Sequence, residues 1–198
     1  MYQISPETNL SDFLVEMNCA NKLIKLGARP PVVRSLCKIG RKISIRIYRE
    51  VYHCASKQGM LPYDPYWIVR SSVNDIHASI FMGIFHDLSQ LNNQQTTHAQ
   101  AFITAYELYC EVVGNNPGPG RLEACVNKSR LLEINRAWQL IQQFNNSETS
   151  LMVCEKCRSR YLALNTVPKP FQQCPICDVW AHKDGRRRWA SVKSRRKA

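Results

Sequence analysis

The chain has 198 residues, of which 44% are hydrophobic, and it carries a formal net charge of +12 and nine cysteines. This composition excludes a disordered chain and fits one domain of ordinary size with at most a small appendage. The longest apolar run, 78–85, is closed by His77 and His86 and falls far short of the ~20 residues that cross a bilayer. The first residues lack the features of a signal peptide, so we expect a cytoplasmic protein whose cysteines are thiols or metal ligands.

The positive charge is concentrated in two blocks. Residues 21–50 contain nine basic residues and one acid, a net +8, and residues 151–198 contain twelve basic residues and three acids, a net +9. The rest of the chain carries −5. Two such blocks on an acidic body favour a polyanion, and nucleic acid in particular, over a merely solvated surface. An anionic membrane surface is disfavoured, because neither block borders a large free apolar face.

Hydrophobic periodicity predicts a helical body. Apolar residues at helical spacing indicate helices that begin near Leu10, at Pro30 and after Gly40, and Gly27 is a stop signal for the first. A turn-rich aromatic connection at 57–67 precedes a long, largely buried helix through 76–88 and another around 102–109. A breaker at 114–120 follows, and then an amphipathic helix that stops near Asn145. Between 150 and 180 the helical period disappears, which predicts a different kind of module.

The segment 30–52 has the outline of a helix-turn-helix, with a short helix, a turn at Gly40 and a second helix. Such a unit would present its second helix to a DNA groove. The competing interpretation is a basic scaffold helix that packs on Ile43, Ile47 and Val51. Under the DNA-binding interpretation, the contacts in this segment would come from Arg34, Lys38, Arg41, Lys42 and Arg46.

Four of the cysteines form two C-x-x-C pairs, Cys154 with Cys157 and Cys174 with Cys177, separated by sixteen residues. This spacing is typical of a zinc site in which two knuckles on adjacent hairpins complete a tetrahedron of thiolates. An iron–sulfur cluster accepts the same ligands, and the spacing does not exclude it. A redox dithiol is disfavoured because it needs one pair beside a βαβ pattern. We expect one structural Zn²⁺ per chain, with no open position for catalysis.

The other reactive side chains do not converge on a catalytic site, and we expect no enzyme. His77 lies on a helical stripe beside Phe81, so it is expected to be a hydrogen-bonded core residue rather than a ligand. No paired carboxylates in an apolar setting, no phosphate loop and no Ser/His/Asp order stand out. The cysteines outside the two pairs are expected to be small buried hydrophobes; they are Cys19, Cys37, Cys54, Cys110 and Cys125.

The predicted fold is therefore mainly α, with a small zinc-ribbon-like module and a basic tail. The boundaries are a helical body at 1–147, the four-cysteine module at 148–182 and a flexible tail at 183–198. The tail follows the metal module directly, so the module would place its first residues. It is expected to contact phosphates, through Arg186, Arg187 and Arg188.

Several short runs occur in an order that resembles one known family. They are Leu26–Arg29, Ile47–Glu50, Gly59–Pro62, Trp67, His77–Ser79 and Arg136–Trp138, followed by the two cysteine pairs and a basic end. Over residues 11–188 the chain resembles FlhC, a subunit of the bacterial flagellar master transcriptional activator. No single run is decisive, but their order and spacing, together with the cysteine quartet, are specific.

The resemblance implies a mostly helical subunit with zinc held by Cys154, Cys157, Cys174 and Cys177. It also implies a heterohexamer of four FlhD and two FlhC that binds promoter DNA of flagellar operons and helps recruit RNA polymerase. The expected function is a DNA-binding transcriptional activator subunit, either at flagellar promoters or, for a paralogue, at others. The alternatives are a zinc-ribbon RNA-binding or ribosome-associated protein, and an adaptor whose zinc module contacts proteins.

Overall fold

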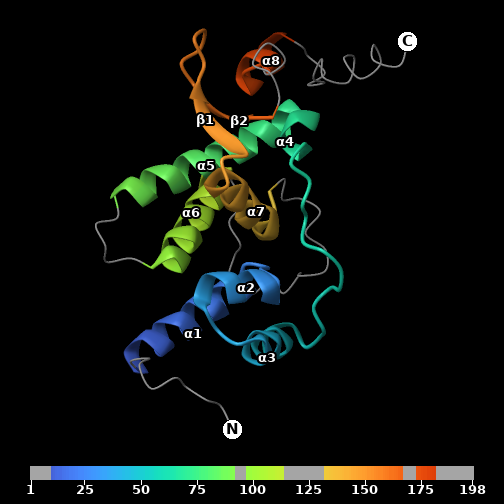
Figure 1. Ribbon diagram of the computed structural model, residues 1–198, viewed down its shortest axis with the longest axis vertical. Coiled ribbons are helices and arrows are strands. Elements are labelled where there is room, and N and C mark those ends of the chain that lie inside the picture. Colours follow the sequence, from blue (N-terminus) through green and yellow to red (C-terminus); the bar gives the residue numbers. More distant parts are fainter. Residues whose placement is uncertain (1–9, 92–96, 114–131, 167–172, 182–198) are drawn as a thin grey trace.

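A computed structural model describes residues 10–91, 97–113, 132–166 and 173–181. The described chain is mainly helical with one small sheet, as predicted (Figure 1). None of its helices is long and apolar enough to span a bilayer. In chain order the elements are α1 (Leu10–Lys25), α2 (Pro30–Cys37), α3 (Arg41–Tyr52), α4 (Trp67–Arg70), α5 (Ser72–Leu91), α6 (His98–Val112), α7 (Ile134–Asn145), β1 (Thr149–Val153), β2 (Arg160–Leu164) and α8 (Pro175–Ala181).

Helices α1, α2 and α3 pack on one another at one end of the molecule (Figure 1). Gly27 ends α1 with a φ of 99°, a left-handed conformation that glycine adopts without steric cost. Pro30 opens α2, where its missing N–H is tolerated, and the C-cap of α2, Lys38, is in the left-handed region. Gly40 is the N-cap of α3. The local signals at these turns therefore predicted the helix boundaries.

Helix α5 crosses the middle of the molecule and carries much of the core. Phe81 is fully buried and makes edge-to-face contacts with Phe102, Tyr106 and Tyr109 of α6, at centroid separations of 6.1–6.3 Å. His77 on the same helix bonds through Nδ1 to the Tyr109 hydroxyl at 2.7 Å, which confirms it as a hydrogen-bonded residue. Burial lowers the pKa of His77. The second apolar stripe of α5, at 76, 80, 84 and 88, is only half-buried.

The C-terminal elements lie at the opposite end from α1–α3 (Figure 1). Strands β1 and β2 form an antiparallel pair whose register runs from Thr149 opposite Leu164 to Val153 opposite Arg160. Leu162 and Leu164 belong to the same hydrophobic core as the helices. The short helix α8 was not predicted, because a helix of 7 residues is too short to show a hydrophobic period.

The cysteines outside the two pairs divide differently from the prediction. Cys19, Cys37 and Cys110 are buried, as expected for small hydrophobes, and burial raises the pKa of the Cys37 thiol to about 12. The prediction for Cys54 was wrong, since this thiol is exposed. It follows His53, where a left-handed backbone turns the chain away from α3. Cys125 and the breaker at 114–120 lie outside the described residues.

Candidate metal centre and nucleic-acid interface

The two C-x-x-C pairs are placed by different kinds of local structure. Cys154 and Cys157 lie in the turn between β1 and β2, which the Cys154 N–H closes by donating to the Ser159 carbonyl at 2.9 Å. Cys174 immediately precedes α8 and Cys177 lies in its first turn. The expected second hairpin is therefore absent from the described chain, and a helix start takes its place. Both arrangements bring residues three apart onto one side, so each directs two sulfurs to the same point.

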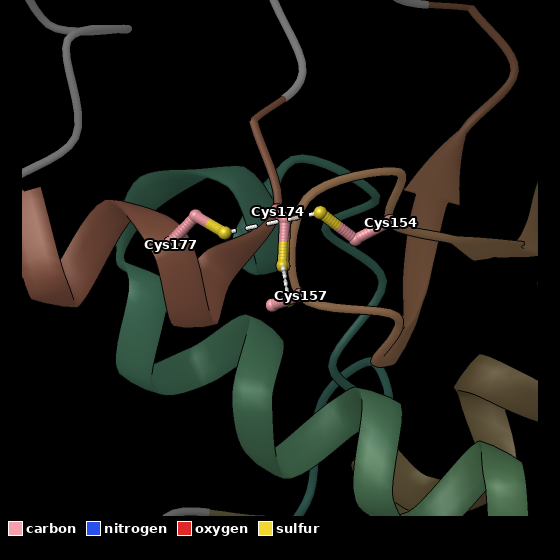
Figure 2. A group of neighbouring side chains, drawn as sticks. All are labelled: Cys154, Cys157, Cys174 and Cys177. Atoms are coloured by element: carbon pink, nitrogen blue, oxygen red, sulfur yellow. Dashed lines mark hydrogen bonds between the residues drawn. The ribbon is translucent and has the colours of Figure 1, made fainter.

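The four sulfur atoms converge (Figure 2). The Cys154 and Cys177 sulfurs are 3.8 Å apart, those of Cys157 and Cys174 are 3.6 Å apart, and all four lie within 4.8 Å of one another. A tetrahedron with zinc–sulfur bonds of about 2.3 Å has edges of about 3.8 Å. These separations are far above the ~2.05 Å of a disulfide. The arrangement fits a thiolate-preferring metal ion.

The thiols of the cluster differ in their protonation behaviour. Hydrogen bonds from Ser159 lower the pKa of Cys157 to about 6. Burial raises the pKa of Cys174 to about 12. The pKa of Cys177 is also raised, mainly by the hydrogen bond to Cys157 and to a smaller extent by burial. Four thiolates do not share one small volume unless a cation offsets their charge, and metal binding at such a site releases protons.

A row of polar contacts on α5 holds the cysteine-bearing segments. Ser72 Oγ donates to Asp178 Oδ2 on α8. Ser79 Oγ donates to Asp75 Oδ1 at 3.0 Å and accepts from a backbone N–H of β2 at 2.8 Å. We call this row, made of Ser72, Asp75, Ser79 and Asp87, the polar seam of α5.

The last contact of the polar seam is a bidentate ion pair. Arg160 at the start of β2 donates to both carboxylate oxygens of Asp87, at 2.6 and 2.5 Å. The guanidinium lowers the pKa of Asp87 to about 2. Sequence reasoning missed the seam. The available signal was the four-residue repeat of small or acidic residues at 75, 79, 83 and 87, which follows one side of a helix with two apolar stripes.

The basic residues singled out in 30–52 lie on the surface of α2, α3 and the turn between them. Arg34, Lys38, Arg41, Lys42 and Arg46 are all exposed, while Ile47 is buried in the core. One shallow hollow is lined by residues of α2, including Arg34, and by Lys38 and Ile39, which follow the helix. A second is lined by Lys42, Ile45, Arg46, Arg49, Glu50 and His53. The segment therefore has exposed cations on both helices and at the turn between them, while Ile39 and Ile47 are buried in the core.

The chain was compared with known proteins, and the family model for the flagellar transcriptional activator FlhC matches residues 9–190. The chain belongs to the FlhC family. Among its relatives is the flagellar transcriptional regulator FlhC of Gallionella capsiferriformans (strain ES-2), 30% identical over 162 residues, which are 82% of each chain. That of Nitrosomonas eutropha is 26% identical over 180 residues, covering 91% of this chain and 87% of the relative.

Family membership makes this FlhC chain a flagellar transcriptional regulator rather than an enzyme. It also implies a place in the FlhD/FlhC activator complex. The FlhC of Enterobacter cloacae is 28% identical over 171 residues, covering 86% of this chain and 83% of the relative. The resemblance drawn from the short sequence runs and the cysteine quartet is therefore confirmed.

The basic residues of segment 21–50 have different partners in the structure. Arg29 is half-buried and donates to the carbonyls of Lys57, Gly59 and Met60 at 2.7–3.0 Å, which attaches the connection after α3 to the start of α2. Arg46 forms an ion pair with Glu50, one turn along α3, at 2.8 Å. Arg49 and His53 in the α3 hollow were not among the predicted contacts. Arg186, Arg187 and Arg188 lie outside the described residues.

Proposed function

We propose that this FlhC chain is a DNA-binding subunit that acts with FlhD in the cytoplasm at promoters of flagellar operons. The observation that carries the proposal is the set of exposed cations on α2, α3 and the turn between them, in helices whose other sides pack in the core. Clustered cations on one side of a two-helix unit bind DNA by neutralising phosphates and releasing counterions.

The roles proposed for the basic residues differ by position. Lys42 and Arg46 lie on the exposed side of α3, beside a hollow with an apolar residue at its wall, and would lie along a groove. Arg34, Lys38 and Arg41 lie on α2 and around the turn, where they would contact phosphates. The tail, including Arg186, Arg187 and Arg188, would add sequence-independent phosphate contacts.

The four-cysteine cluster is proposed to hold one structural Zn²⁺ per chain. The support is the donor set, four sulfurs at tetrahedral separations, in a small segment of two short strands and one short helix. Because cysteine occupies every ligand position, the ion would stabilise the fold and would not activate a substrate. We expect Cys174→Ser to abolish stoichiometric zinc, measured by metal analysis, and to abolish DNA binding. Visible absorption from bound iron and sulfide would instead identify an iron–sulfur cluster.

The first half of α1 is proposed as part of the FlhD interface. Leu10 and Leu14, one turn apart on α1, are apolar side chains that are 69% and 55% exposed. Asp12 and Glu16 flank them, and no basic residue occurs on α1 before Lys22. An apolar, acidic surface of this kind repels DNA and suits a partner helix with basic flanks. The proposed assembly is four FlhD and two FlhC, which recruits RNA polymerase.

The FlhD interface can be tested by co-purification. We expect the double variant Leu10→Glu and Leu14→Glu to lose FlhD in a co-expression pull-down. Leu91→Glu serves as the control, because Leu91 is also largely exposed, at 76%, but lies at the end of α5. Normal recovery of FlhD with the α1 variant would remove this surface from the interface.

DNA binding can be tested by fluorescence anisotropy of the FlhD/FlhC complex on a flagellar promoter duplex at several salt concentrations. The double variant Lys42→Gln, Arg46→Gln should weaken binding and reduce the slope of log K against log salt by about two. Replacing Arg186, Arg187 and Arg188 of the tail by Gln should reduce that slope by about three. Lys22→Gln is the control, because Lys22 faces Glu107 of α6. An unchanged slope would contradict the proposed face, and tighter binding to structured RNA would favour the RNA-binding alternative.

A further inference from the structure

The four cysteines come from two chain segments, and both segments are attached to the same helix. The segment with Cys154 and Cys157 continues into β2, which is bonded to Asp87 and Ser79 of α5. The segment with Cys174 and Cys177 continues into α8, which is bonded to the start of α5. The polar seam of α5 therefore spans both halves of the metal centre.

Asp178 is the contact through which α8 is attached. It directly follows the ligand Cys177, and its backbone N–H donates to the carbonyl of Cys174 at 2.9 Å. Its side chain is 2% exposed and accepts from Ser72 Oγ, which is fully buried. A carboxylate this deeply buried is costly to leave without its hydrogen-bond donors, so the pair strongly favours one position of α8 on α5.

We propose that Asp178 and Ser72 are positioning residues for the metal ion, an inference that rests on the proposed zinc site. By fixing α8 on α5, the pair holds Cys174 and Cys177 toward Cys154 and Cys157 before the ion binds. Ligands that are already in place lose less conformational freedom on binding, which raises affinity and slows release. Contacts that orient metal ligands from outside the coordination sphere typically change affinity by about 10- to 100-fold.

The test measures zinc release from the full-length, zinc-loaded chain into an excess of a chelating dye. We expect Ser72→Ala and Asp178→Ala each to accelerate release about tenfold. Asp178→Asn keeps an oxygen that accepts from Ser72, so this variant should release zinc at a rate close to that of the wild type. The matched control is Ser89→Ala at the far end of the same helix: in the described chain this hydroxyl bonds within α5, donating to the Phe85 carbonyl at 2.7 Å, and its loss should leave the rate within about twofold.

A double-mutant cycle distinguishes a direct link from general destabilisation. If Ser72 and Asp178 act as one unit, the double variant Ser72→Ala, Asp178→Ala should release zinc no faster than the single Asp178 variant. The inference would be overturned by wild-type release rates in both single variants, by additive effects in the double variant, or by equal acceleration in Ser89→Ala. Absence of stoichiometric zinc in the wild-type chain would overturn the proposed zinc site, and this inference with it.

Discussion

Residues of one type have different partners in this FlhC chain, and their sequence neighbours do not reveal which. Arg29 donates to three backbone carbonyls, and Arg160 forms a two-pronged ion pair with Asp87. The Arg136 guanidinium lies 4.7 Å from the centre of the Trp67 ring, and burial lowers its pKa. The Arg29 guanidinium, which is bonded to three carbonyls, is less available to DNA, so the charge of +8 on residues 21–50 overstates the charge of the proposed binding surface.

The burial of His77 predicts a pH dependence of stability. Its pKa is lowered in the fold, whereas the unfolded chain takes up a proton as the pH falls through about 6.5. The unfolded state then binds more protons, so the free energy of unfolding should decrease below that pH. We expect the melting temperature to fall less between pH 7.5 and 5.5 in His77→Gln than in the wild type. An equal fall in melting temperature in both proteins would show that His77 has the same pKa in the folded and unfolded states.

Among the elements, α5 has three different surfaces, and the hydrophobic periodicity of its sequence does not describe all of them. Its Phe81 side packs on α6, a second apolar stripe is half-buried, and the polar seam contacts β2 and α8. The hydrophobic pattern predicted the helix and its apolar sides. The polar seam could not be predicted as a contact surface, because the residues it bonds lie 73 to 106 positions away in the chain.

Gly83 on the same helix provides a test of how closely β2 approaches. A Cβ there would meet only the Arg160 Nη2 atom, at 3.8 Å, which is ordinary van der Waals contact. Alanine also restricts the unfolded chain, so Gly83→Ala should stabilise the fold by about 0.5–1 kcal/mol in denaturant titration. Gly83→Leu, whose side chain displaces Arg160 from Asp87, should be destabilising. A loss of stability in the alanine variant would mean that the backbones pack more closely than described.

At the level of the whole molecule, the segment with the four-cysteine cluster and the helical body share one core. Leu162 and Leu164 of the strand that follows the first cysteine pair are buried together with residues of α5, α6 and α7. Asp87 and Asp178 attach the same region to α5 by polar contacts. These contacts provide a physical route by which loss of the metal would affect the helices.

We therefore expect removal of the proposed zinc ion by a chelator to lower the melting temperature of the whole chain. Each kcal/mol of lost stability should lower it by about 2–4 °C for a chain of this size. Hydrogen exchange should show weaker protection in α5 as well as in α8 and the hairpin. The control is Cys154→Ser with Cys174→Ser, which should be insensitive to the chelator. Unchanged protection in α5 would show that the metal module unfolds independently.

Helix boundaries and the cysteine quartet followed from sequence because their causes are local. Gly27, Pro30 and Gly40 act within one or two residues, and a C-x-x-C pair brings its two sulfurs together on its own. The family, too, was apparent from the order of short runs. The exposure of Cys54 and Leu10 and the bond between Ser72 and Asp178 became apparent only from the tertiary structure. They depend on which helices pack together, and packing is a property of residues distant in the chain.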